Sequence, residues 1–312
     1  MRTAFLFPGQ GSQRVGMGTA LARYPAARDV FAAVDEALER PLSRVMADGP
    51  EDELTLTRNA QPALMAVSIA AVRALEAELG RPFEAFADVV AGHSLGEYTA
   101  LTAAGTFDVA TAARLLDLRG AAMQAAVPVG EGAMAALMGL DVERVARLLA
   151  AIDGVVDIAN DNADGQVVVS GARAAVDAAV AAAQAAGARR VTVLPVSAPF
   201  HCRLMRPAAE RMAAALAEVT LAPPAMPVVA NVTAEPLTDV DAIRAALIDQ
   251  VCGRVRWRET MVALAAEGTG RVVEAGAGKV LAGLAKRGVK GSTVMNVETA
   301  DDVTEVAAAL AG

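Results

Sequence analysis

The sequence has few of the residues that build disulfide frameworks, metal centres or aromatic surfaces. Its 312 residues include two cysteines, two histidines and 3% aromatic residues. Cys202 and Cys252 are too few for a disulfide framework and match no zinc-binding spacing. Because isolated cysteines suit a reducing compartment, we expect a cytoplasmic protein that uses no metal.

Long hydrophobic runs and an excess of basic residues are also missing. A membrane-spanning helix needs about 20 consecutive apolar residues, and the longest candidate, residues 174–188, is interrupted by Asp177 and Gln184. The apolar run at the start of the chain is too short for a secretory signal. The formal net charge is −8, with no basic run. The sequence therefore argues against a membrane protein and against nucleic acid as the main partner.

What is present is a long chain, apolar enough to bury a sizeable core. Its 54% hydrophobic residues suit one large domain with an insertion, or two domains. Short buried strands alternate with helical patterns, which predicts an α/β fold with a mostly parallel sheet covered on both faces. The expected strands are 3–7, 88–91, 228–231 and 271–274, and the expected helices are 61–79, 97–105, 204–219 and 241–251. Pro62 should lie in the first turn of its helix.

The middle of the chain has a different order of elements. Strand, helix, strand, strand, helix and strand are expected at 132–140, 142–152, 155–160, 166–170, 173–186 and 189–196, with a turn at 162–165. This βαββαβ order is that of the ferredoxin-like unit. We therefore predict an inserted ferredoxin-like subdomain, residues 127–197, in a core made of residues 1–126 and 198–312.

Residues 92–96, Gly-His-Ser-Leu-Gly, match the nucleophile elbow between a strand and a helix. The two glycines allow close approach of the neighbouring backbone. Ser94 would stand above the sheet edge, and the N–H of Leu95 would point to where an oxyanion forms. The alternative is a purely structural turn, but the strand before it and the helix after it favour a catalytic serine.

A serine hydroxyl needs a base to take its proton. His93 directly precedes Ser94, so its side chain should diverge from the hydroxyl. His201, on a proline-stiffened turn before a helix, is the remaining candidate. A lone histidine is more often structural, yet an elbow serine with no rival base favours His201 as the base.

Six segments resemble, in order and spacing, the malonyl-CoA:acyl carrier protein transacylases of fatty-acid synthesis. They are FPGQGSQ (7–13), GHSLGEY (92–98), LRG (118–120), GQVVVSG (165–171), PFH (199–201) and GKVL (278–281). The resemblance covers essentially the whole chain. It implies an α/β-hydrolase-like core with a ferredoxin-like insert, and it implies no metal or redox cofactor.

The resemblance also implies a role for each matching position. Ser94 would take the malonyl group, and His201 would be the general base and later the acid. Backbone N–H groups of Gln10 and Leu95 would form the oxyanion hole, and the backbone carbonyl of Gln250 would orient the base in place of a carboxylate. The further residues expected at the cleft are His93, Asn162 and Phe200.

Arg119 would decide the substrate. In the family this arginine binds the free carboxylate of malonyl, which a planar fork of donors can hold in bidentate fashion; the alternative is an ordinary surface arginine. Phe200 resembles the malonyl-selecting form of its turn, because a bulky ring leaves little room for a methyl branch. Asn162 has a simpler alternative as a turn former. Residues 253–257 depart from the family's usual turn, and we expect this to affect only loop packing near Gln250.

The resulting hypothesis is ping-pong transfer of malonyl from malonyl-CoA to the phosphopantetheine thiol of acyl carrier protein, for fatty-acid chain elongation. The alternatives are a serine thioesterase or other hydrolase, a non-catalytic carrier-docking module, and a transacylase serving a polyketide or malonate decarboxylase carrier. Because carrier proteins are typically acidic, the enzyme should dock one through a local basic face. The candidates near His201 in sequence are Arg189, Arg190, Arg203 and Arg206. A monomer is expected.

Overall fold

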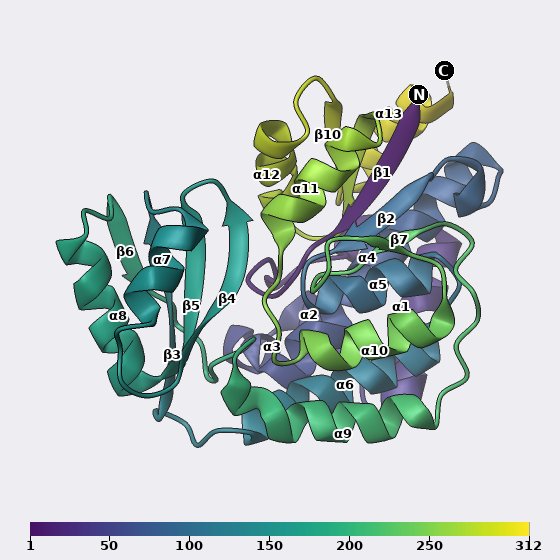
Figure 1. The fold of residues 1–312 in the computed structure, drawn as a ribbon. Coiled ribbons are helices and arrows are strands. Elements are labelled where there is room, and N and C mark those ends of the chain that lie inside the picture. Colours follow the sequence, from purple (N-terminus) through teal and green to yellow (C-terminus); the bar gives the residue numbers. More distant parts are fainter. Residues whose placement is uncertain (312) are drawn as a thin grey trace.

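The computed structural model describes residues 1–311, which form a larger and a smaller lobe (Figure 1). The strands are β1 (Arg2–Phe7), β2 (Val89–Gly92), β3 (Gly132–Met138), β4 (Val156–Ala163), β5 (Gln166–Ala172), β6 (Arg190–Val193), β7 (Val228–Val229), β8 (Pro236–Leu237), β9 (Thr269–Ala275) and β10 (Thr293–Val297). The helices are α1 (Pro25–Leu38), α2 (Leu42–Asp48), α3 (Glu51–Thr55), α4 (Thr57–Leu79), α5 (Leu95–Ala103), α6 (Val109–Ala125), α7 (Val142–Leu149), α8 (Arg173–Ala185), α9 (Arg206–Ala217), α10 (Val240–Gln250), α11 (Trp257–Ala266), α12 (Val280–Gly288) and α13 (Ala300–Ala311).

The larger lobe is built on a six-stranded sheet in the order β10-β9-β1-β2-β7-β8, parallel except for the β7–β8 pair. Side chains of β1 alternate between two hydrophobic cores, as the two-residue period of a strand requires. Phe5 and Phe7 pack with α1, α4 and α6, whereas Ala4 and Leu6 pack with α11 and α12. The predicted parallel sheet with helices on both faces is confirmed.

The longest helix of the larger lobe, α4, lies along this sheet and is mostly buried. It begins at Thr57, four residues earlier than expected, so Pro62 lies in its second turn and the prediction of a first-turn proline is wrong. A proline this close to the start removes one early intrahelical hydrogen bond. Packing of the buried helix outweighs that local cost.

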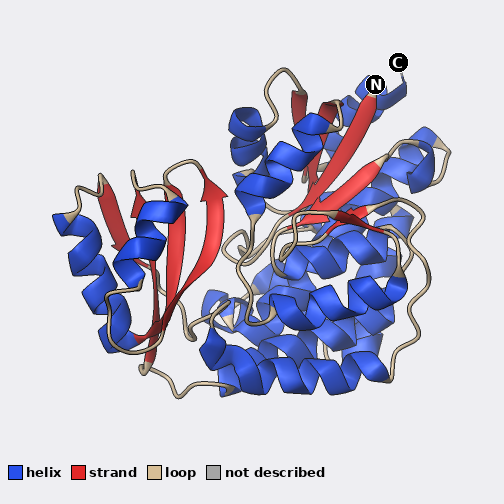
Figure 2. Ribbon diagram, viewed as in Figure 1, coloured by secondary structure: helices blue, strands red, loops and turns tan. Residues whose placement is uncertain are grey.

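The smaller lobe is an antiparallel sheet in the order β4-β5-β3-β6, with α7 and α8 on one face (Figure 2). Its element order, βαββαβ, confirms the expected ferredoxin-like unit. All of these elements lie within the predicted insert 127–197; the exact division of the chain into 1–126, 127–197 and 198–312 stays a prediction. The expected turn at 162–165 is shorter, because Asn162 and Ala163 belong to β4.

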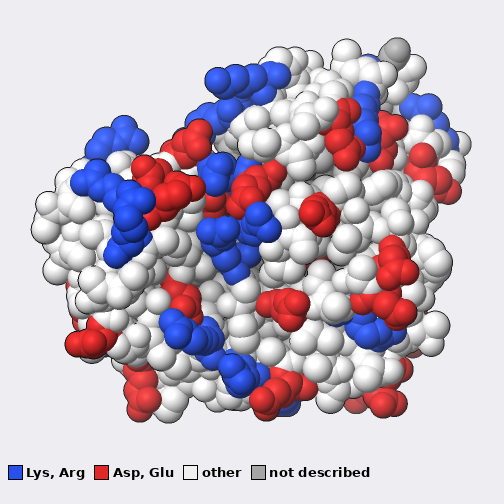
Figure 3. All heavy atoms as spheres, in the orientation of Figure 1, with Lys and Arg blue, Asp and Glu red and all other residues white. Residues whose placement is uncertain are grey.

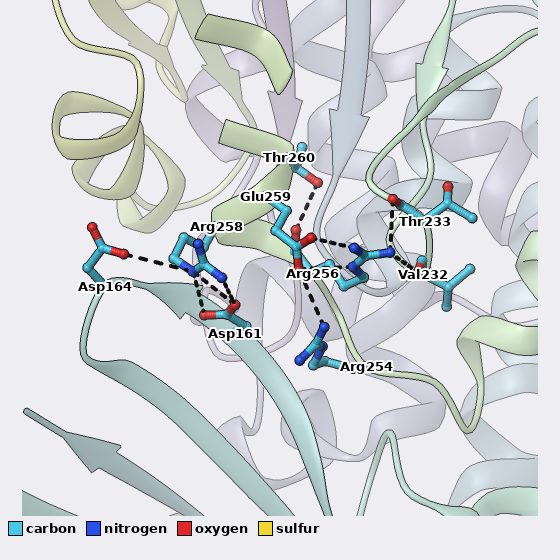
Figure 4. A network of polar contacts seen from close by, with 9 residues as sticks. All are labelled: Asp161, Asp164, Val232, Thr233, Arg254, Arg256, Arg258, Glu259 and Thr260. Atoms are coloured by element: carbon cyan, nitrogen blue, oxygen red, sulfur yellow. Dashed lines mark hydrogen bonds and ion pairs between the residues drawn. The ribbon is translucent and has the colours of Figure 1, made fainter. Parts of the chain in front are cut away.

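A polar network joins the two lobes along β4 (Figure 4). The N–H of Asp161 donates to the carbonyl of Val255 at 2.9 Å, and the N–H of Val255 donates to the carbonyl of Ala159 at 2.8 Å. The carboxylate of Asp161 pairs with Arg258 at 2.9 Å. The insert is therefore fixed to the segment that precedes α11, and strand β4 of the insert also packs against α11 itself.

Within residues 1–311, we find no helix with both the length and the apolar character that crossing a membrane requires.

Candidate active site

The strand-to-helix turn between β2 and α5 is a sharp elbow. Ser94, at its apex, has φ 56° and ψ −113°, a backbone conformation that costs free energy and is often found at functional sites. A Cβ at Gly92 would lie 1.7 Å from the carbonyl oxygen of Gly96, and one at Gly96 would lie 2.3 Å from the carbonyl oxygen of Phe7. Both glycines are therefore required by the close backbone packing that the sequence predicts.

Ser94 and His201 meet at hydrogen-bond distance, with Oγ 2.7 Å from Nε2. On the other side of the ring, Nδ1 lies 2.9 Å from the carbonyl oxygen of Gln250 and 3.2 Å from that of Gly253. Because carbonyls only accept, Nδ1 carries the proton, which leaves Nε2 to accept from the serine. Burial, together with the nearby positive charge of Arg119, lowers the pKa of His201 to about 3, so the ring is neutral.

The contact with Gly253 corrects one expectation. Residues 253–257 were expected to affect only loop packing, yet the carbonyl of Gly253 is a second acceptor for His201 Nδ1. A Cβ at this position would lie 2.7 Å from the carbonyl oxygen of Asp249. The unusual glycine allows the chain after α10 to fold back against the histidine.

Arg119, on α6, is 1% exposed and lies beside the serine. Its Nη2 donates to Ser94 Oγ at 3.2 Å and to Gln250 Oε1 at 2.8 Å, and its Nη1 donates to Gln61 Oε1 at 2.8 Å. The alternative of a surface arginine is wrong. None of the carboxylates in residues 1–311 forms an ion pair with it, and its Nε–H is buried without a hydrogen-bond acceptor there. Burial lowers the pKa of this guanidinium, because neutral partners compensate its charge poorly.

The two expected oxyanion donors belong to neighbouring segments. Leu95 is the first residue of α5, so its N–H has no intrahelical partner and points out of the positive end of the helix. Gln10 follows β1, and a Cβ on the preceding Gly9 would lie 2.7 Å from the carbonyl oxygen of His93. The Gln10 loop and the elbow are thus in contact, as the family resemblance implies.

Three further predicted residues surround this centre. His93 turns away from the serine, as expected: its Nε2 lies 2.9 Å from Asn162 Oδ1, and its ring lies 5.3 Å from that of Trp257. Burial lowers the pKa of His93, which keeps it neutral. Asn162 is on strand β4, so the turn-former alternative for it is wrong. Phe200 is buried in the core of the larger lobe, next to His201 in the chain.

Sequence reasoning missed three polar residues of this site. Asn231 accepts the N–H of Ser94 at 2.7 Å and donates to the carbonyl of Gly92 at 2.7 Å, so its side chain closes the elbow. Glu97 and Gln61 are the others. Their signal in the sequence is a polar side chain within an otherwise apolar helix or at the carboxyl end of a buried strand, where sites of α/β folds are found. No group of three His, Cys, Asp or Glu side chains in residues 1–311 could hold a metal ion.

Comparison with known proteins shows the family to which this chain belongs. The profile of the acyl transferase domain matches residues 4–308. The chain belongs to this family. It is 46% identical, over 287 residues covering 91% of this chain and 92% of the relative, to the malonyl CoA-acyl carrier protein transacylase of Escherichia coli K12. The acyl-carrier-protein S-malonyltransferase structure from Bartonella henselae is 51% identical, with a TM-score of 0.97 and full coverage of both chains. The predicted fold class and the predicted resemblance are confirmed, and the protein is an acyltransferase.

A third similar structure includes a carrier protein. It is described as a type II polyketide acyl carrier protein in complex with its malonyl-transacylase; it is 40% identical, with a TM-score of 0.95, and the match covers 99% of this chain and all of that one.

The four arginines considered for carrier docking do not form one face in this acyltransferase. Arg203 and Arg206 lie within a few residues after His201, and Arg203 forms a bidentate ion pair with Asp157 on β4. Arg190 instead begins β6, opposite Met138 at the far end of β3. On the face shown in Figure 3, Lys and Arg side chains are spread over both lobes and interspersed with Asp and Glu.

The sheet register gives the separation of the two groups. Asp157 is level with Met134 through Ser170, and Arg190 is level with Met138, four residues further along. This offset along the strands, combined with the three strand spacings across the sheet from β4 to β6, places Asp157 and Arg190 about 20 Å apart. Arg189 and Arg190, near His201 in sequence, therefore lie apart from Arg203, because strand β6 carries them away from the turn. Which of the four arginines serve carrier docking stays a prediction.

Proposed function

We propose that this acyltransferase moves a malonyl group from malonyl-CoA to the phosphopantetheine thiol of an acyl carrier protein, through an ester on Ser94. The observation that carries the proposal is the buried Arg119, which lies 3.2 Å from the serine hydroxyl and has only neutral hydrogen-bond partners among residues 1–311. A buried cation beside a nucleophile fits an acyl group that bears its own carboxylate. The names of the similar proteins support the same substrate.

In the loading step, His201 Nε2 accepts the hydroxyl proton while Ser94 Oγ attacks the thioester carbonyl of malonyl-CoA. The N–H groups of Gln10 and Leu95 stabilise the negative charge that develops on the carbonyl oxygen. As the tetrahedral intermediate collapses, the C–S bond breaks, and the imidazolium returns its proton to the coenzyme A thiolate. The carbonyl of Gln250 keeps the Nδ1 proton in place throughout.

The second step runs through the same groups in the reverse direction. His201 takes the proton of the carrier's phosphopantetheine thiol, the thiolate attacks the malonyl ester, and the ester C–O bond breaks. The proton then returns to Ser94 Oγ. Free enzyme and malonyl carrier protein result, so each proton and each acyl bond is accounted for without any redox or metal chemistry in our scheme.

For the carrier surface we infer a role for Arg189 and Arg190. Both are exposed, and no carboxylate of residues 1–311 pairs with either of them, whereas Arg203 is already neutralised by Asp157. Their charge suits an acidic partner. Charge reversal of both should raise the Michaelis constant for the carrier and leave loading unchanged. The comparison is charge reversal of Arg203 and Arg206. A larger rise in the Michaelis constant for the carrier in that variant would assign docking to that pair.

Fatty-acid synthesis is the pathway we infer, since the chain covers 92% and 90% of the lengths of two relatives that are named malonyl CoA-acyl carrier protein transacylase and not assigned to polyketide synthesis. A polyketide biosynthesis protein, matched over 24% of its own length, is 42% identical, so the carrier itself has to be tested. The free thiols Cys202 and Cys252 support our proposal of a cytoplasmic enzyme. We also propose a monomer, which sedimentation equilibrium can test.

Intact mass spectrometry after mixing the protein with malonyl-CoA alone tests the proposal. We expect a stable adduct with the mass of one malonyl group, lost in Ser94→Ala and kept in the control Ser292→Ala. Rapid release of malonate without an adduct would indicate a hydrolase. No reaction at all would leave a carrier-docking module. Adding the fatty-acid or polyketide carrier to the loaded enzyme then identifies the acceptor.

A further inference from the structure

Glu97 is a buried carboxylate for which the proposed transfer steps have no use. It is the third residue of α5 and is 2% exposed. Its Oε2 accepts the N–H of Asn231 at 3.0 Å and the Nε2 of Gln250 at 2.8 Å. Burying a carboxylate is costly, so its place between these two donors needs an explanation.

Both donors belong to residues that hold the reacting groups. The side chain of Asn231 bonds to Ser94 N at the elbow apex and to Gly92 O at the end of strand β2. The main chain of the same asparagine is fixed by Glu97. The strained conformation of Ser94 is therefore maintained by an asparagine whose own position depends on the buried carboxylate.

Gln250 connects the carboxylate to the remaining groups. Its carbonyl accepts from His201 Nδ1 at 2.9 Å, and its side-chain Oε1 accepts from Arg119 at 2.8 Å. Its Nε2 donates to the carbonyl of Ser94 at 2.9 Å as well as to Glu97. One residue thus touches the base, the nucleophile's main chain and the arginine.

The orientation of the Gln250 side-chain amide decides whether it can accept a hydrogen bond from Arg119. An amide has an acceptor end and a donor end, and rotating it by 180° would direct its NH₂ group at the donors of Arg119. Glu97 accepts at the donor end and Arg119 donates at the acceptor end. Burial raises the pKa of Glu97 to about 7, so above this pH the carboxylate form prevails. The two opposite charges then favour one orientation of the amide, and with it one position of the guanidinium.

We propose that Glu97 is a positioning residue for acyl selection: its carboxylate fixes the Gln250 amide and through it the Arg119 guanidinium, and it holds the Ser94 turn through Asn231. This inference rests on the proposed roles of Ser94 and Arg119. A simple structural role for Glu97 would lower malonyl and acetyl loading equally, by lowering the folded fraction. The positioning role lowers malonyl loading more, because the malonyl carboxylate alone uses the guanidinium.

The test compares Glu97→Gln and Glu97→Ala for loading from malonyl-CoA and acetyl-CoA, measured as rates of adduct formation above pH 8, where the wild-type Glu97 is ionised. We expect the ratio of malonyl to acetyl loading to fall about tenfold in Glu97→Ala, with a raised Michaelis constant for malonyl-CoA. Glu97→Gln keeps an oxygen that can accept both hydrogen bonds but has no charge, so its ratio should lie between those of Glu97→Ala and the wild type. If Glu97→Ala does not fold, the Gln variant alone decides: an unchanged ratio overturns the proposal.

Glu274 provides a matched control. It is also buried and also accepts two hydrogen bonds, here from the backbone N–H groups of Leu281 and Ala282. Its contacts are with α12, so Glu274→Gln should leave the malonyl to acetyl ratio unchanged. A ratio that falls equally in both variants would show a general effect of removing a buried charge and would overturn the inference.

A double-mutant cycle separates this inference from the proposed function. With Arg119→Ala as background, Glu97→Gln should have no further effect on the ratio, because its effect passes through the guanidinium. Additive effects would contradict the positioning role even if the wild type forms the malonyl adduct. A wild type that forms no adduct would instead contradict the proposed function.

Discussion

The Nη2 of Arg119 lies 3.2 Å from Ser94 Oγ, so the nucleophile and the buried cation are direct neighbours. An acyl group on this oxygen must extend past the guanidinium. If it bears a carboxylate, that carboxylate can be held by a charge-assisted pair of hydrogen bonds. An acetyl group leaves the guanidinium with its present neutral partners.

Arg119→Ala should therefore reverse the acyl preference. Truncating one partner of a buried charge pair costs about 2–5 kcal/mol, so malonyl loading should fall at least about 30-fold while acetyl loading is unchanged or rises. Rates of adduct formation from the two CoA esters measure this. Arg114→Ala, at an exposed position on the same helix, is the control and should change neither rate; an equal loss of both rates in Arg119→Ala would contradict the carboxylate clamp.

The rate of loading should show no acidic limb from His201 between pH 5 and pH 8. Burial and the charge of Arg119 lower the pKa of this histidine to about 3, so its Nε2 stays an acceptor throughout that range. A histidine of ordinary pKa, about 6.5, would lose most of its base form at pH 5. Stopped-flow loading rates measured against pH test this. A rate that falls with a pKa near 6.5 would contradict the expectation, provided that this pKa also shifts when Arg119 is mutated, which would assign it to His201.

The same shift makes the fold less stable in acid. Because the pKa of His201 is lower in the folded chain, the unfolded chain binds more protons between pH 6.5 and pH 3, and the free energy of unfolding falls as the pH falls through this range. The loss from this group should be about 2 kcal/mol between pH 8 and pH 5. Urea unfolding of wild type and His201→Gln at both pH values measures it, since the variant should lose less.

Much of this site follows from local chain geometry and was predictable for that reason. Gly92 and Gly96 require a close turn, and parallel strands bring the elbow and the Gln10 loop to one sheet edge. The residue types of Ser94 and His201 then limit the chemistry. The predicted βαββαβ insert was also readable, because alternation of strand and helix periods depends only on nearby residues.

Contacts between segments far apart in the chain were not predictable. Asn231 closes an elbow 137 positions away, and Glu97 meets Gln250 across 153 positions. Neither has a local pattern beyond being polar among apolar neighbours. The role of Arg119 was implied only by the family resemblance, and its burial depends on where α6 packs. Propensity describes neighbours in sequence, whereas these positions are set by tertiary packing.

Two glycine substitutions should have opposite effects on stability. In Gly92→Ala the new Cβ would lie 1.7 Å from a backbone oxygen, which no side-chain adjustment can relieve, so the variant should lose at least about 3 kcal/mol or fail to fold. Gly283, exposed within α12, has open space around its Cβ position. Gly283→Ala should raise the free energy of unfolding by about 0.5–1 kcal/mol. Thermal melting temperatures of the two variants and the wild type measure these effects. A Gly92→Ala variant as stable as the wild type would contradict the elbow geometry.

The ion pair of Arg258 and Asp161 should matter more to stability than that of Arg203 and Asp157. The Asp161 side chain is 1% exposed, whereas Arg203 is 61% exposed. Arg258→Met would leave a buried carboxylate without its partner, a change that costs about 3–5 kcal/mol. Arg203→Met breaks a pair in solvent, which is worth about 1 kcal/mol or less.

Urea midpoints of the two variants test this difference, and the double variant Asp161→Asn, Arg258→Met tests its cause. If the unpaired charge is responsible, removing it should recover part of the stability lost in Arg258→Met. Asp161 also bonds through its N–H to Val255, and its neighbour Asn162 contacts His93. Loosening of β4 in Arg258→Met should therefore slow malonyl loading as well, whereas Arg203→Met should leave it unchanged. Equal destabilisation by the two arginine variants would show that burial of Asp161 does not set the strength of the contact between the lobes.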